Sequence, residues 1–124
     1  MPTPDTLKRF IARVESNMHA EAVEEFYTED ASIQENQSPA RIGRAPQAAR
    51  ERLLMSRATS VTSQCVHPVF VNGDHVVIRW IFHFEWVDGS YTHMEELAYQ
   101  LWENERISQE TFFYDPAQGA PKKR

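Results

Sequence analysis

Apolar residues recur at helical spacing in the first part of the chain. Within residues 3–17, "TPDTLKRFIARVESN", they stand three, four and seven positions apart, and residues 19–27, "HAEAVEEFY", repeat the pattern. This spacing places the apolar side chains on one helix face, and the Thr and Asp residues at the start are typical of a helix N-terminus. Residues 47–58, "QAARERLLMSRA", consist almost entirely of strong helix formers. The sequence therefore predicts three helices.

Alternating apolar and polar residues replace this pattern from residue 59 onward. Four such stretches, separated by short turn-like segments, cover residues 60–71, 75–87, 90–102 and 106–114. Alternation with period two predicts strands, and consecutive strands joined by short turns pair antiparallel. A shorter strand is expected at residues 31–35, "ASIQE". The order helix, helix, strand, helix and four strands predicts an α+β domain in which the helices cover one face of an antiparallel sheet.

Length and composition limit the class of protein. The 124 residues, with a hydrophobic content of 41%, predict one domain at residues 1–116 and a flexible tail at 117–124. The net charge of −5 argues against a nucleic-acid-binding protein, which needs a basic face for phosphates. There is a single cysteine, no apolar run that spans a membrane and no apolar segment at the N-terminus. We therefore expect a cytoplasmic protein that binds neither nucleic acid nor membrane.

The predicted strand at residues 75–87 indicates which face of the sheet is inside. Trp80, Phe82 and the other aromatic residues of this strand point to one side, while Arg79 and Glu85 point to the other. Such an aromatic row is typical of a packed core. It also suits an apolar ligand pocket, because a bent sheet covered by helices leaves a hollow at one end. Both interpretations remain open on the pattern alone.

Four stretches of the chain resemble the nuclear transport factor 2-like superfamily. They are "EEFYTEDASIQE", "RIGRAPQAARERL", "VVIRWIFHFEWVDG" and "LWENERISQETFFYDP", and the resemblance runs from about Leu7 to Pro116. The superfamily includes ketosteroid isomerases, SnoaL-like polyketide cyclases and limonene epoxide hydrolases. The resemblance implies a cone-shaped, cystatin-like domain with three helices on the concave face of a curved antiparallel sheet, an apolar cavity and a homodimer formed through the sheet. This fold hosts enzymes, carriers and interaction modules alike.

Glu35 is the first candidate for acid–base chemistry. Ile33 and Glu35 stand two positions apart in a predicted strand, so both side chains point to the same face. A carboxyl group among apolar side chains loses solvation, which raises its pKa and suits it to proton transfer near neutral pH. The resemblance places Glu35 where ketosteroid isomerases carry the aspartate that shuttles a proton. The alternative is that the strand frays and Glu35 lies at the pocket rim, paired with Arg41 or Arg44.

The register of the last two strands decides the other candidates. In the register usual for the superfamily, Glu110 and Phe112 face the pocket from one strand, and Glu96 and Gln100 face it from the other. A slip of one residue exchanges the faces and turns Leu97 and its outward neighbours inward. The superfamily commonly has Gly in the last turn, where this chain has Glu105.

Glu35 and Glu110 form the candidate catalytic pair, because two neighbouring carboxyl groups push their pKa values apart. The positions at which the isomerases hold the enolate oxygen correspond here to Phe10 and Ala98, and without two donors steroid isomerase activity is not expected. The residues expected to contact a small apolar ligand are Phe10, Tyr27, Trp80, Phe82, Glu96, Gln100, Phe112 and Tyr114.

No metal site or cofactor is expected. His67, His83 and His93 stand on separate predicted strands without ligand spacing, and no phosphate-binding loop is present. Arg41 and Arg44 are expected to be solvated.

Two hypotheses about function remain. The first is a cofactor-independent isomerase, cyclase or hydrolase that acts on a small apolar substrate, and the second is a non-catalytic ligand-binding or dimerisation module.

The outer face of the predicted sheet supports the homodimer implied by the resemblance. In the usual register this face is too apolar to remain in water, which predicts that a second copy covers it. Its apolar residues are Val77, Ile81, Leu97, Tyr99, Leu101 and Phe113.

Overall fold

Three α-helices, six strands and one short 3-10 helix make up the computed structural model, which describes residues 1–124. The helices are α1 (Pro4–Glu15), α2 (His19–Phe26), α3 (Arg44–Ser56) and the 3-10 helix η1 (Pro116–Gly119). The strands are β1 (Tyr27–Glu35), β2 (Arg41–Ile42), β3 (Ala58–Asn72), β4 (His75–Trp86), β5 (Tyr91–Glu103) and β6 (Arg106–Phe113). None of the helices has both the length and the apolar character needed to cross a membrane.

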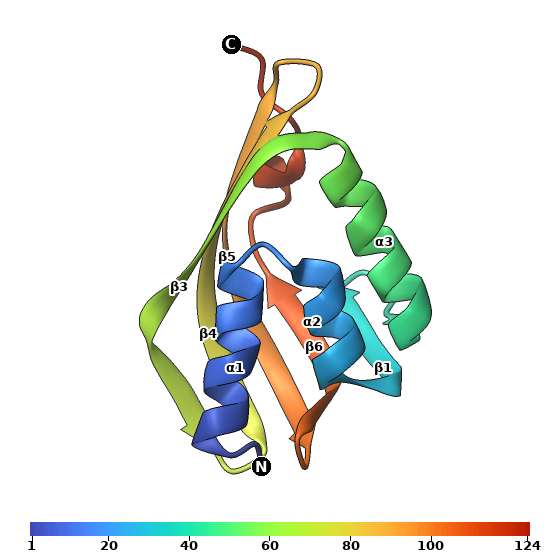
Figure 1. Ribbon diagram of the computed structural model, residues 1–124, viewed down its shortest axis with the longest axis vertical. Coiled ribbons are helices and arrows are strands. Elements are labelled where there is room, and N and C mark those ends of the chain that lie inside the picture. The colour runs from blue at the N-terminus through green and yellow to red at the C-terminus, as the bar shows by residue number, and fades with distance from the viewer.

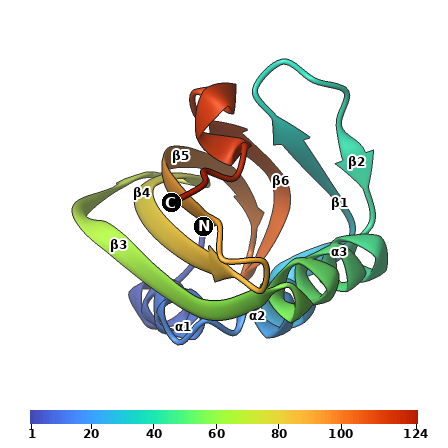
Figure 2. The same cartoon turned by 90° about the horizontal axis from the view of Figure 1, so that it is seen from above.

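The strands form one open sheet in the order β2-β1-β6-β5-β4-β3. Strands β3, β4, β5 and β6 form the antiparallel meander that the alternating pattern predicts. The strand β1 pairs in parallel with β6 and antiparallel with the short strand β2, and neither pairing is predicted from the sequence. The sheet curves, and the three α-helices pack on one of its faces (Figures 1 and 2). The α+β fold expected from the order of elements is therefore confirmed.

The register of β5 and β6 is the one that the resemblance implies. Gln100 lies opposite Glu110, and both side chains are buried on the helix side of the sheet. The slipped alternative is wrong, because Leu97 is 45% exposed on the outer face. The turn between these strands needs no glycine, since Asn104 adopts a φ of 57°. Asparagine tolerates this left-handed conformation better than most residues.

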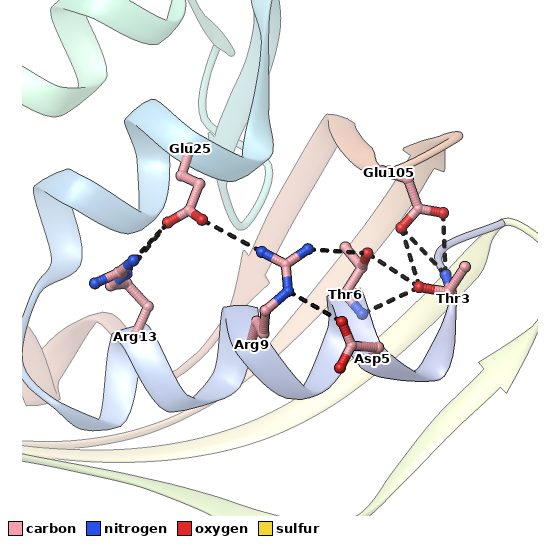
Figure 3. Close-up of polar contacts among 7 residues, drawn as sticks. All are labelled: Thr3, Asp5, Thr6, Arg9, Arg13, Glu25 and Glu105. Atoms are coloured by element: carbon pink, nitrogen blue, oxygen red, sulfur yellow. Dashed lines mark hydrogen bonds and ion pairs between the residues drawn. The ribbon is translucent and has the colours of Figure 1, made fainter.

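Polar contacts hold α1 against its neighbours (Figure 3). Thr3 caps the helix, because its side-chain oxygen accepts a hydrogen bond from the backbone N–H of Thr6 at 3.1 Å. The Thr3 hydroxyl in turn donates to Glu105 in the turn between β5 and β6 at 3.2 Å. At the other end of the helix, Arg13 and Glu25 of α2 form an ion pair at 3.0 Å. Each exposed contact is weak, so the position of α1 rests mainly on its buried face, which includes Phe10, Ile11 and Val14.

The core lies between the helices and the concave face of the sheet. Phe10 of α1 packs edge-on against Phe26 and Trp102, with ring centroids 5.5 and 5.8 Å apart. On β4, Trp80 and Phe82 are buried, and their rings stack at 5.5 Å. The aromatic row predicted to face inward therefore does so.

The tail at residues 117–124 lies along the sheet in the structure, although the sequence predicts a flexible segment. Beyond the end of β6, the backbone N–H of Lys122 donates to the Tyr91 carbonyl of β5 at 2.7 Å. The side-chain oxygen of Gln118 accepts from the backbone N–H of Glu95 at 2.8 Å. Gly119 lines the interior cavity. The tail thus supplies part of the cavity wall.

Candidate active site

A cavity of about 200 Å³ lies between the helices and the concave face of the sheet. Its wall is largely apolar, with Val23 of α2, Leu54 of α3 and Met94 of β5 beside the aromatic residues of β4. Gln100 does not line the cavity, because it is fully buried behind Glu110. The other residues expected to contact a ligand all line it, namely Phe10, Tyr27, Trp80, Phe82, Glu96, Phe112 and Tyr114.

Glu110 is held by a buried chain of hydrogen bonds. It is only 3% exposed, and the Tyr27 hydroxyl donates to its Oε1. The side-chain amide of Gln100 donates to Oε2 at 2.7 Å. The indole N–H of Trp102 donates to the carbonyl oxygen of Gln100 at 2.9 Å, which fixes the orientation of the amide. Both oxygens of Glu110 therefore have a donor, and the carboxyl group keeps one orientation at the cavity wall.

Three carboxyl groups of the cavity have raised pKa values. Burial raises the pKa of Glu110 to about 7, although its two hydrogen-bond donors act in the opposite direction. Burial, together with the charges of Glu110 and Glu35, raises the pKa of Glu96 to about 8. The pKa of Glu51 is also raised, in the first place by burial. Near neutral pH the site thus holds a mostly protonated carboxyl group, Glu96, and one, Glu110, that populates both forms.

Glu35 combines the two arrangements that the sequence leaves open. It lines the cavity on the same strand face as Ile33, yet its side chain is 28% exposed and forms an ion pair with Arg41 at 2.9 Å. In the parallel pairing of β1 with β6, Ile33 lies opposite Glu110 and Glu35 lies opposite Phe112. Glu35 and Glu110 are therefore diagonal neighbours on one face of adjacent strands. Two carboxyl groups in this arrangement are suited to acid–base chemistry.

Neither of the two arginines near the start of α3 is simply solvated, so that expectation is wrong. Besides its ion pair with Glu35, Arg41 donates to the side-chain oxygen of Gln47 at 3.2 Å. Arg44 donates to the backbone carbonyl of Tyr27 at 3.1 Å. Arg41 lines the cavity and brings a positive charge to it.

Three polar residues of the cavity wall are missing from the sequence prediction. Gln47 and Glu51 enter from α3, where Gln47 donates to Glu51 at 3.0 Å, and His19 enters from α2. Burial lowers the pKa of His19 to about 4, so the ring is neutral at pH 7. The apolar residues of the segment that forms α3 are spread around the helix, so its pattern does not indicate which face points inward. No group of three or more His, Cys, Asp or Glu side chains is arranged to hold a metal ion.

The chain is similar to known proteins in both sequence and fold. The family model of the SnoaL-like domain matches residues 7–109. A Mesorhizobium loti protein, provisionally described as a SnoaL-like polyketide cyclase, is 19% identical, with a TM-score of 0.74 over 92% of this chain and 100% of its own. An LEH-like epoxide hydrolase from M. tuberculosis is 12% identical, with a TM-score of 0.74 over 92% of this chain and 83% of its own.

A third similar structure contains a ligand. It is a Catenulispora acidiphila protein with a ketosteroid isomerase-like fold, in complex with trimethylamine. It is 14% identical, with a TM-score of 0.75 over 94% of this chain and 89% of its own. No curated protein matches this chain in sequence. At such low identities these structures show a shared nuclear transport factor 2-like fold and leave the activity open.

Proposed function

The chain belongs to the SnoaL-like family, and on that premise we propose that its cavity binds a small, largely apolar molecule and that its carboxyl groups move a proton to or from this molecule. The observation that carries the proposal is Glu110, a buried carboxyl group at an apolar cavity with a pKa of about 7. Such a group acts as acid or as base near neutral pH, which general acid–base catalysis requires. The reaction class is an isomerisation, a cyclisation or a hydrolysis.

Glu35 is the second catalytic carboxyl group in this proposal. It is the diagonal neighbour of Glu110, and its charge helps to raise the pKa of Glu110. Its partner Arg41 supplies a positive charge at the same side of the cavity. A cation in this position stabilises negative charge that develops on a substrate oxygen. In this assignment Glu110 transfers the proton, and Glu35 with Arg41 forms the polar end of the site.

The similar structures support a small-molecule site in this fold. One of them is described as an epoxide hydrolase, and another contains trimethylamine. The largely apolar wall of the cavity agrees with a ligand that is mostly hydrocarbon.

A nitrobenzisoxazole tests the proton-transfer step although the natural substrate is unidentified. When a base removes the proton from its ring carbon, the ring N–O bond breaks and a coloured cyanophenolate forms, with no other reactant. We expect the wild-type protein to accelerate this ring opening, with a rate that rises through pH 7 as Glu110 ionises. Glu110→Gln should lower the rate by about two to four orders of magnitude. Glu95→Gln, which removes an exposed carboxylate beyond the cavity, should leave the rate unchanged.

Equal ring-opening rates in wild type and Glu110→Gln would contradict the catalytic assignment. They would favour the second candidate, a non-catalytic ligand-binding module. One observation supports that alternative, because both oxygens of Glu110 already accept hydrogen bonds, from Tyr27 and Gln100. In that case native mass spectrometry of the purified protein should detect a bound small molecule, with no turnover of the benzisoxazole.

We also propose that two copies of the domain associate through the outer face of the sheet. Leu97, Tyr99 and Phe113 are all exposed there, on neighbouring strands. Phe70 of β3 extends the same face, because it lies opposite Val77. An exposed apolar patch of this kind on a sheet is typical of a protein interface.

A further inference from the structure

Glu96 is the one carboxyl group of the cavity that has no partner in the protein. It is nine-tenths buried, with 9% of its surface exposed, and it lines the cavity from β5. Glu35 is ion-paired, Glu51 accepts from Gln47, and Glu110 accepts two hydrogen bonds. The oxygens of Glu96 instead face the open space of the cavity. Because no buried side-chain oxygen of the protein lacks a hydrogen-bond partner, the unpartnered oxygens of Glu96 are open to the cavity, and this space is where a ligand can bind them.

The charges around Glu96 favour a positively charged partner. Arg41 is the one cationic side chain in the cavity wall, and it is already paired with Glu35. His19 is neutral at pH 7, because burial lowers its pKa to about 4. The titratable and charged groups that line the cavity are Tyr27 and Glu35 from β1, Arg41 from β2, His19 from α2, Glu51 from α3, Glu96 from β5, Glu110 from β6 and Tyr114. The wall thus contains four carboxyl groups and a single cation.

Aromatic rings surround the same space. Trp80 lies directly opposite Glu96 on the neighbouring strand β4, and its ring stacks on Phe82. Phe112 and Tyr114 line the cavity from the other side of β5. Aromatic faces attract cations, and the attraction is strongest where the cation is desolvated. A carboxyl group beside aromatic rings is therefore the environment that binds an alkylammonium group.

We propose that the ligand of this cavity carries a small alkylammonium group, which lies between Glu96 and the neighbouring aromatic rings. The proposal rests on the small-molecule function proposed above and specifies its ligand as a mostly apolar amine. It does not require Glu96 to take part in the reaction, and proton transfer by Glu110 is compatible with it.

Such a ligand couples its own binding to the release of a proton. The pKa of Glu96 is about 8 in the empty cavity, so the group is mostly protonated at pH 7. A bound cation favours the ionised form and displaces the proton into solvent. Affinity for a cation should therefore rise with pH up to about pH 8, by up to about tenfold for each pH unit. A neutral ligand that accepts a hydrogen bond from protonated Glu96 shows the opposite dependence.

Tetramethylammonium and tert-butanol form a matched pair of probes. Both have a compact shape and the same number of non-hydrogen atoms, but only the first is charged, and its charge does not titrate. Isothermal titration calorimetry at pH 6, 7 and 8, in two buffers of different ionisation enthalpy, measures affinity and proton release together. We expect tetramethylammonium to bind more tightly as the pH rises and to release about one proton per site at pH 7. tert-Butanol should bind more weakly and without a proton.

Glu96→Gln should lower the affinity for tetramethylammonium by about tenfold or more and reduce the proton release. Glu95→Gln is the matched control, because it makes the same change at the preceding residue, which lies on the outer face of the sheet. If Glu96→Gln does not fold, proton release by the wild-type protein decides instead. The proposal is overturned if tetramethylammonium does not bind, or binds without releasing a proton. If tert-butanol then binds better than the cation, the small-molecule function stands and only the ammonium assignment fails.

Discussion

At the scale of single residues, the cavity carboxyl groups are a burden on the stability of the fold. Glu96 has an ordinary pKa of 4.5, which folding raises to about 8. Between these values the folded protein binds more protons than the unfolded chain does. Glu96 therefore costs the fold no ionisation free energy below pH 4.5, and it lowers the stability progressively as the pH rises from 4.5 to 8. Glu96 lowers stability near neutral pH and has no hydrogen-bond partner in the protein, so its presence is explained by function rather than by folding.

Glu96→Gln should therefore remove part of the pH dependence of stability. At pH 8.5 we expect the variant to be more stable than the wild type, by at most about 1.4 kcal/mol for each unit of pKa shift that the fold imposes. At pH 4 the two proteins should be nearly equal, because the carboxyl group is protonated in both states. Urea unfolding at the two pH values measures the difference. If the stability of Glu96→Gln equals that of Glu95→Gln at both pH values, Glu96 is ionised and well solvated in the wild-type protein.

Glu35→Gln should separate catalysis from folding. The substitution removes the ion pair with Arg41, but both side chains are about one third exposed, so the loss in unfolding free energy should stay below about 1 kcal/mol. Arg41 keeps its hydrogen bond to Gln47. The rate of benzisoxazole ring opening should nevertheless fall, because the charge that helps to raise the pKa of Glu110 is gone. Thermal melting checks the first expectation, and a large drop in melting temperature would make Glu35 a structural residue.

At the scale of elements, the sequence predicts the features that a segment determines by itself, and it does not predict those that depend on a distant part of the chain. Alternation along β4 correctly orients Trp80, because the period of a strand is a property of the strand itself, whereas the inward face of Glu96 on β5 also needed the register that the resemblance implies. The parallel pairing of β1 with β6 brings the Tyr27 hydroxyl within hydrogen-bond reach of Glu110, which lies 83 positions further along the chain. No local pattern encodes this pairing. It is nevertheless what brings Glu35 next to Glu110.

The turn between β5 and β6 is an element whose conformation can be tested. Asn104 holds a left-handed φ of 57° there, between Glu103 and Arg106, which lie opposite each other at the end of the β5–β6 pairing. Asn104→Gly should change the unfolding free energy by less than about 0.5 kcal/mol, because glycine adopts this conformation freely. Asn104→Val should destabilise the fold by about 1–2 kcal/mol, since a β-branched residue is strained at positive φ. Chemical denaturation of both variants checks this, and equal stabilities would argue against the left-handed turn.

At the scale of the whole molecule, the cavity depends on how the helices dock, and that is where sequence reasoning stops. Strand alternation places Glu110 and Phe112 on one face, and the register that the resemblance implies turns this face toward the cavity. Gln47, Glu51 and His19 enter the cavity only because α2 and α3 pack over the sheet as they do. Helix α3 buries Gln47 and Ala48 but leaves Leu53 exposed, which reverses what polarity alone suggests. Tertiary packing, rather than the amphipathic pattern, selects its inner face.

The outer face of the sheet leads to the last prediction, a homodimer. Leu97 lies near the middle of this face, with 45% of its surface exposed and with Val77, Tyr99 and Phe113 on the same side. Leu97→Asp places a charge where the second copy would bury it, so light scattering at micromolar concentration should change from the dimer mass to the monomer mass. Leu53→Asp is the control, because Leu53 is 55% exposed on α3 and should leave the dimer intact. A monomer mass for the wild-type protein would contradict the interface, whereas dissociation by both variants would locate it elsewhere.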